Sequence, residues 1–151
     1  MLNYKKIISR LLDQNIYILS NDDKEAIIID PGLGFDLIDR YLKSENLSPI
    51  AVLATHAHID HIASANDCIK NYNIPFYICR GNSIMLDHYD IMKGYMNVDS
   101  EKPEVSHWIE DSDKKLIIGS FEFNVNYNPG HSPGCMSCLL YTSPSPRDTR
   151  R

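Results

Sequence analysis

The stretch that decides the fold runs Thr55-His56-Ala57-His58-Ile59-Asp60-His61. It follows directly on a continuous apolar run from Ile50 to Ala54, and such a run is typical of a buried strand. The three histidines and the aspartate would then lie on the loop at the carboxyl end of that strand, where rigid α/β scaffolds tend to place their chemistry. A lone histidine is usually structural or solvated, but ligand-type side chains at this density after a buried strand indicate a metal site.

The spacing within this stretch indicates which side chains can share an ion. In an extended segment, side chains two residues apart point the same way, so His56 and His58 can converge on one ion. Asp60 and His61 follow where the chain turns toward a helix, so they are aimed elsewhere and a second ion could lie between them. Imidazole and carboxylate ligands without thiolate favour Zn, Fe, Mn or Ni over a structural all-cysteine site.

Length and composition predict one ordinary globular domain. The chain has 151 residues, of which 43% are hydrophobic and 23% charged, and this is enough to bury a sizeable core. The net charge of −5 argues against a general nucleic-acid binder. There is no apolar run near the roughly 20 residues that span a bilayer, and no secretory signal is expected. The four scattered cysteines favour reduced thiols and a cytoplasmic location.

Apolar patterns along the chain predict a mixture of strands and helices. Strands are predicted at residues 7–12, 15–19, 26–29, 50–54, 75–79, 114–118, 121–125 and 136–141. Helical spacing of apolar residues predicts a helix after Gly34, another after His61, and a short helix around residues 83–88. The rest of residues 80–104 gives no readable pattern. Strands on both sides of a helix make this an α/β unit, with the histidines after the strand that follows the helix.

A second loop with a histidine follows the predicted strand at 121–125. It reads Asn128-Pro129-Gly130-His131-Ser132-Pro133-Gly134. Two prolines and two glycines fix an irregular backbone, as a preorganised ligand loop requires. Alone, His131 would be an incidental turn residue. Paired with the upstream cluster, it becomes a further candidate ligand.

These motifs together resemble the metallo-β-lactamase superfamily. The first stretch is similar to its HxHxDH signature, the second to its Pro-Gly-His-Ser/Thr-Pro-Gly motif, and residues 29–32 (Ile-Asp-Pro-Gly) to a third, all in the family's order within residues 4–141. The resemblance implies an α/β fold, the αββα sandwich of that superfamily, with Asp30 as a buttress for the metal loops. It implies the following metal ligands: His56, His58 and His131 for a first ion, and Asp60 and His61 for a second.

The chemistry that the resemblance implies is hydrolysis by a metal-bound hydroxide. The expected cofactor is Zn²⁺, as one or two ions, with Fe or Mn as alternatives. Two ions about 3.5–4 Å apart would share a bridging hydroxide. Asp60 would serve as the catalytic residue that orients this nucleophile. The expected partner is a small-molecule substrate, with no nucleic acid and no membrane.

The choice of substrate depends on the branch of the superfamily that the chain resembles. The short strand–turn–strand start and the compact spacing between the two histidine motifs look most like the glyoxalase II-like (hydroxyacylglutathione hydrolase-like) branch. That branch cleaves thioesters such as S-lactoylglutathione. A mononuclear iron relative that oxidises persulfides uses similar motifs and is an alternative.

The end of the chain departs from the family pattern. The family continues with an aspartate that bridges both metals and a final histidine, and neither can be placed here. Residues 142–151 have no apolar residue apart from prolines, which indicates a disordered or foreign end, and a basic tail that binds a partner is the other interpretation. We therefore expect an incomplete domain over residues 1–141, a tail over 142–151 and weak metal binding. A truncated, catalytically weak metal-binding domain is the alternative to an active enzyme.

Overall fold

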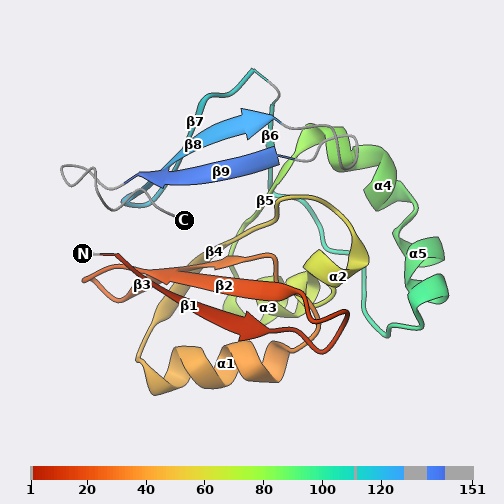
Figure 1. Cartoon of the computed structure of the whole chain (residues 1–151), viewed down its shortest axis with the longest axis horizontal. Coiled ribbons are helices and arrows are strands. Elements are labelled where there is room, and N and C mark those ends of the chain that lie inside the picture. The colour runs from red at the N-terminus through yellow and green to blue at the C-terminus, as the bar shows by residue number, and fades with distance from the viewer. Residues whose placement is uncertain (1, 111, 128–135, 142–151) are drawn as a thin grey trace.

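Two β-sheets lie face to face, and helices cover the outer face of the larger one (Figure 1). The computed structural model of the chain describes residues 2–110, 112–127 and 136–141. Within these residues the larger sheet has six strands and the smaller sheet has three. The layering is helix, sheet, sheet, which is the order expected for the N-terminal part of an αββα sandwich. The predicted fold class is therefore confirmed.

The strands of the larger sheet are β1 (Asn3–Ile8), β2 (Asn15–Ser20), β3 (Glu25–Ile29), β4 (Ser48–Leu53), β5 (Phe76–Cys79) and β6 (His107–Ile109). The strands of the smaller sheet are β7 (Lys115–Ile118), β8 (Phe121–Tyr127) and β9 (Met136–Tyr141). The helices are α1 (Phe35–Ser44), α2 (Ile59–Ile62), α3 (Ala65–Tyr72), α4 (Ser83–Asp87) and α5 (Tyr89–Met96), with a 3₁₀ turn, η1 (Arg80–Asn82). No helix in these described ranges is long and apolar enough to cross a bilayer.

The order of strands in the larger sheet follows their order in the chain. Strands β1, β2 and β3 pair antiparallel, and β3 to β6 pair parallel. Crossovers of the usual right-handed sense that advance in one direction place their helices on the same face of a sheet. Helices α1 and α3 do lie on one face, opposite the smaller sheet (Figure 1). The carboxyl ends of the parallel strands meet at one edge, where α/β folds place their ligands.

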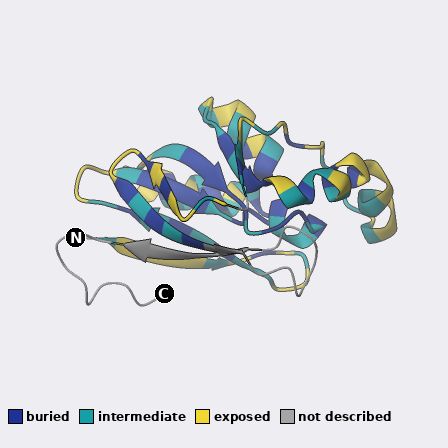
Figure 2. Ribbon diagram, turned by 90° about the horizontal axis from the view of Figure 1, so that it is seen from above, coloured by how far each residue is buried: buried dark blue, intermediate teal, exposed yellow. Residues whose placement is uncertain are grey.

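The larger sheet is buried on both faces, so it contributes to two separate cores. Ile28 and Val52 point toward the helices, whereas their neighbours Ile27 and Leu53 point toward the smaller sheet. This alternation follows from the two-residue period of a strand. Strands covered on both faces have near-continuous apolar sequences, which is why β3 and β4 were readable from sequence. The buried residues accordingly run through the middle of the molecule (Figure 2).

The strand predicted at residues 7–12 is wrong in its position. The observed β1 spans Asn3–Ile8 and pairs with β2 from Asn3 opposite Ser20 to Ile8 opposite Asn15. Leu12 and Asp13 have positive φ angles of 57° and 50°, so the chain turns there instead. Most of β1 is exposed at the edge of the sheet, and an exposed strand shows no burial alternation for the sequence to reveal.

Residues 80–104, most of which gave no pattern, hold two helices, and a short strand follows them. The short helix predicted near residues 83–88 is confirmed as α4, and α5 follows it after His88. Strand β6 has three residues and pairs parallel to β5, with Tyr77 opposite His107. A segment this short contains too few side chains to show a period. The helix predicted after His61 is divided at Ser64 into α2 and α3.

Candidate metal centre

The metal loop, defined here as residues 54–58, begins where β4 ends. The ladder to β5 extends one residue beyond β4, because the Ala54 N–H donates to the Tyr77 carbonyl at 3.1 Å. His58 has extended backbone angles and caps the N-terminus of α2. Asp60 and His61 therefore lie within α2 itself, and the His61 N–H donates to the His58 carbonyl at 2.9 Å. The loop and the helix start lie at the carboxyl edge of the sheet, as the sequence predicts.

Three imidazole rings come together at this point. The ring centroids of His56 and His58 are 4.6 Å apart and nearly perpendicular, and those of His56 and His61 are 4.0 Å apart. His56 is buried, whereas His58, Asp60 and His61 are each partly exposed. The cluster is thus buried on the side of His56 and accessible to solvent on the side of His58, Asp60 and His61. The fifth predicted ligand, His131, lies outside the described residues.

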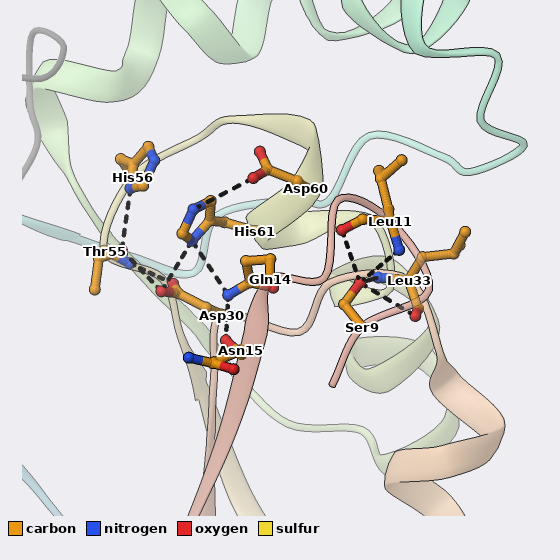
Figure 3. Close-up of polar contacts among 10 residues, drawn as sticks. All are labelled: Ser9, Leu11, Gln14, Asn15, Asp30, Leu33, Thr55, His56, Asp60 and His61. Atoms are coloured by element: carbon orange, nitrogen blue, oxygen red, sulfur yellow. Dashed lines mark hydrogen bonds and ion pairs between the residues drawn. The ribbon is translucent and has the colours of Figure 1, made fainter. Parts of the chain in front are cut away.

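Asp30 ties the metal loop to the end of β3. One carboxylate oxygen accepts the Thr55 N–H at 2.7 Å, and the other accepts the Thr55 hydroxyl at 2.9 Å. That second oxygen also lies 3.1 Å from Nδ1 of His61 (Figure 3). Asp30 is buried and has a φ of +51°, a left-handed conformation that aspartate tolerates better than most residues. These contacts are those expected of a buttress.

The contact with Asp30 fixes which nitrogen of His61 is available. Nδ1–H donates to the carboxylate, so Nε2 faces away, and it lies 3.6 Å from a carboxylate oxygen of Asp60. Metal-binding histidines are commonly oriented by such a carboxylate on their other nitrogen. Burial by itself lowers the pKa of His61, but the hydrogen bond and charge of Asp30, with the charge of Asp60, outweigh it and raise the pKa above 6.5.

The donor atoms fit a divalent transition metal by type and by spacing. Two ligand atoms that share an ion at bond lengths of about 2.0–2.2 Å lie roughly 3.3–3.6 Å apart. The separation of 3.6 Å between His61 Nε2 and Asp60 Oδ2 falls at the upper end of that range. Within the described residues, no group of three or more His, Cys, Asp or Glu side chains is placed to hold a metal ion. The residues present therefore fit a metal through this one pair, His61 and Asp60, which has the spacing of two ligands that share an ion.

The loop after β3 packs closely against α2, and Gly32 makes this possible. A Cβ at position 32 would lie 2.6 Å from the Asp60 carbonyl oxygen, 2.6 Å from Oε1 of Gln14 and 2.7 Å from Oγ of Ser9. The Ser64 N–H also donates to the Pro31 carbonyl at 2.9 Å. The backbone under Asp60 is thus held by direct contact with the loop that carries Asp30.

Two amide side chains that the sequence did not single out lie beside the cluster, and one of them is hydrogen bonded to the metal loop. Nε2 of Gln14, in the turn between β1 and β2, lies 3.4 Å from Nδ1 of His61, but because Nδ1–H donates to Asp30 both groups are donors, and Gln14 packs against the ring without a hydrogen bond to it. Asn82, in the region without a readable pattern, is fully buried, and its Oδ1 accepts the Ala57 N–H at 3.0 Å. Neither belongs to a motif of ligand residues. The strand order was needed to bring them to the loop.

Comparison with known proteins gives a consistent picture. A family model described as the metallo-beta-lactamase superfamily matches residues 9–141. The chain is 34% identical over 128 residues to the probable metallo-hydrolase YqgX of Bacillus subtilis (strain 168), a match that covers 83% of this chain and 60% of that protein. It is 25% identical over 122 residues to the hydroxyacylglutathione hydrolase of Citrobacter koseri, covering 81% of this chain and 41% of that protein.

A solved structure extends the likeness to three dimensions. The crystal structure of the BLEG-1 B3 metallo-beta-lactamase matches with a TM-score of 0.81 and 36% sequence identity. That match covers 91% of this chain and 67% of the BLEG-1 chain. The chain therefore spans well under the full length of the proteins that it resembles.

Proposed function

This chain belongs to the metallo-β-lactamase superfamily, a superfamily of metal-dependent hydrolases, and from that premise we propose that its protein hydrolyses a small-molecule thioester with a metal-bound hydroxide. One observation carries the proposal: three imidazoles and the Asp60 carboxylate gather at the carboxyl end of β4, and Asp30 orients one of those imidazoles toward Asp60. Because the chain spans only part of its relatives, the activity is proposed for the whole protein.

Each residue of the cluster has a proposed role. His56 and His58, with His131, hold a first ion, and Asp60 and His61 hold a second. When bound, such ions supply a hydroxide nucleophile near neutral pH and polarise the scissile carbonyl. Asp30 keeps Nδ1 of His61 protonated and so leaves Nε2 to bind. Asp60, held in the first turn of α2, orients the nucleophile.

The thioester is favoured over other acyl substrates by two lines of support. The short strand–turn–strand start and the spacing of the histidine motifs are similar to the glyoxalase II-like branch. The chain is also 25% identical over 122 residues to a hydroxyacylglutathione hydrolase. Zn²⁺ is the proposed ion, since imidazole and carboxylate donors suit it, and these donors also suit Fe or Mn.

The test combines metal analysis with turnover. The purified protein is assayed for bound metal by atomic absorption and for hydrolysis of S-lactoylglutathione, with a β-lactam as the comparison substrate. We expect the protein to hydrolyse the thioester, and we expect both a chelator and His56→Ala to abolish this activity. His107 is an exposed histidine on β6, so His107→Ala should retain the activity. A protein that neither contains nor takes up metal contradicts the proposal. Bound iron together with persulfide oxidation would support the mononuclear iron alternative instead.

A further inference from the structure

We propose that Asn82 is a positioning residue that fixes the metal loop and so sets how His56 and His58 are presented to a metal ion. This proposal rests on the proposed function, because it requires that the histidine cluster binds a metal ion. It concerns a residue outside every motif that marks the site. Asn82 ends the 3₁₀ turn η1, which follows β5, and β5 is the parallel neighbour of β4.

The side-chain amide of Asn82 is fully buried, and both its oxygen and its nitrogen form hydrogen bonds. Its oxygen accepts the Ala57 N–H at 3.0 Å, and its nitrogen donates to the Cys79 carbonyl at 3.1 Å. These two partners determine the orientation of the amide, because a rotated group would place its NH₂ against a backbone N–H. The side chain is therefore a fixed link from the end of β5 to the middle of the metal loop.

Within the described residues, each neighbour of β4 contributes one side chain that binds the loop backbone. Asp30, after β3, binds Thr55, and Asn82, after β5, binds Ala57. His56 lies between the two held residues, and His58 follows directly on the second. Because side-chain direction follows the backbone, fixing positions 55 and 57 fixes the direction in which both imidazoles leave the loop.

The two halves of the cluster depend on Asn82 to different extents. Asp60 and His61 lie in α2, and His61 has its own contact with Asp30 at 3.1 Å. The Ala57 link lies between His56 and His58; Nδ1 of His56 is also 3.1 Å from the Thr55 hydroxyl, so His58, which follows directly on Ala57, depends most on this link. Loss of the Asn82 oxygen leaves a buried N–H without an acceptor, and the loop must move to satisfy it. Loss of residues that orient metal ligands typically weakens metal binding by about 10–100-fold.

The experiment uses two variants and one control. Asn82→Leu has a similar size and no acceptor, whereas Asn82→Asp keeps an oxygen for the Ala57 N–H. Ile38→Val removes one buried methylene group on α1, outside the metal loop and its hydrogen bonds, and so controls for general destabilisation. Hydrogen exchange of the Ala57 amide is measured without metal, and Zn²⁺ affinity is measured by calorimetric titration.

We expect the Ala57 amide of Asn82→Leu to exchange at least tenfold faster than in the wild type, and its Zn²⁺ affinity to fall about tenfold or more. Asn82→Asp keeps the acceptor for Ala57 but loses the donor to the Cys79 carbonyl, so it should recover part of the protection and part of the affinity relative to Asn82→Leu, and Ile38→Val should leave the affinity unchanged. Wild-type affinity in Asn82→Leu overturns the proposal. So does fast exchange of Ala57 in the wild-type protein itself, which needs no variant to fold.

The two proposals fail in different ways. If the wild-type protein takes up no Zn²⁺, the proposed function fails, and the exchange of Ala57 still decides whether Asn82 fixes the loop. If the wild type binds Zn²⁺ and Asn82→Leu binds it equally well, the positioning role fails and the proposed function stands.

Discussion

Asp30 shows how much of the site depends on a residue that is not proposed to bind the ion. Its two oxygens receive three donors, from the Thr55 backbone, the Thr55 hydroxyl and the His61 ring. A carboxylate can accept all three, whereas an amide has a single oxygen acceptor. The negative charge also strengthens each of these bonds relative to a neutral acceptor.

Replacing Asp30 by asparagine should therefore destabilise the metal-free protein. Asparagine keeps the shape and tolerates the positive φ of this position, so the loss reflects the missing acceptor and charge. We expect the free energy of unfolding in urea to fall by about 1–3 kcal/mol. The control is Asp36→Asn, which removes an exposed ion pair with Arg10 and should have a much smaller effect. Equal losses in the two variants would contradict the role of Asp30.

The same contact predicts a pH dependence for the metal-free protein. The pKa of His61 is raised in the folded state above its ordinary value of 6.5, because Asp30 and Asp60 outweigh the opposing effect of burial. His61 therefore binds a proton more tightly in the folded state than in the unfolded chain. The resulting contribution to the free energy of unfolding is fully present below pH 6.5 and is lost as the pH rises through the folded-state pKa. The free energy of unfolding, measured by urea denaturation in the presence of a chelator, should decline as the pH rises from 6.5 through the folded-state pKa. In Asp30→Asn the decline should be shallower, and an unchanged slope would contradict the assignment.

The candidate ligand side chains could be identified from the sequence, and the side chains that surround them mostly could not. His56, His58, Asp60 and His61 stand within six consecutive residues, so their chemistry shows in the sequence itself. Asn82 reaches the loop only because β5 lies beside β4, and Gln14 only because the turn before β2 meets the same edge. Amides carry no distinctive spacing, so only the fold identifies them.

Close packing between the loop after β3 and helix α2 predicts that a larger side chain at Gly32 destabilises the protein. Gly32→Ala places a Cβ within 2.6 Å of the Asp60 carbonyl, which belongs to backbone that cannot easily give way. We expect a loss of about 1–3 kcal/mol in unfolding free energy, as for other overpacked sites. Gly94→Ala, within α5 and with nothing within 4 Å of the new Cβ, should instead stabilise by about 0.5–1 kcal/mol. Urea unfolding of both variants checks the pair, and similar changes in both would contradict the packing argument.

The elements that could be predicted are those that are buried on one face, as in an amphipathic helix, or on both faces, as in a central strand. Helix α1 has an amphipathic face, and β3 and β4 are buried on both sides, so their patterns are strong. Strand β1 is exposed at an edge and β6 is three residues long, so neither shows a period. Their positions depend on pairing with β2 and β5, which a local pattern does not contain.

At the scale of the whole molecule, metal binding should appear as global stabilisation. A ligand at a hundredfold excess over its dissociation constant stabilises the folded state by about 2.7 kcal/mol. For a chain of this size that corresponds to a rise in Tm of roughly 5–11 °C. We expect Zn²⁺ to produce this shift and chelator to reverse it in a thermal scan. A variant with both His56 and His58 replaced by alanine should lose the shift, His107→Ala should keep it, and the same shift in every variant would show non-specific binding.

The layered architecture was predictable through the motifs more than through periodicity. The α/β alternation is legible up to β5, but nothing in the local patterns says that β7 and β8 leave the first sheet for a second one. That division follows from packing: Phe121 and Phe123 are buried against residues of β3 and β4 in the core between the sheets. Of the predicted ligands, His56, His58, Asp60 and His61 lie together at the carboxyl end of β4, and His131 lies outside the described residues; that they bind a metal stays a prediction.

The agreement between strand order and chain order also bears on how the protein is made. Each strand from β2 to β6 pairs with the strand synthesised just before it, so the larger sheet can grow progressively as the chain leaves the ribosome. The antiparallel pairs β1–β2 and β2–β3 close short turns, whereas the parallel pairs from β3 to β6 close longer crossovers and form more slowly. The links from Asp30 and Asn82 to the metal loop join only β3, β4 and β5. Both side-chain links to the metal loop thus come from segments that are translated before β7, β8 and β9.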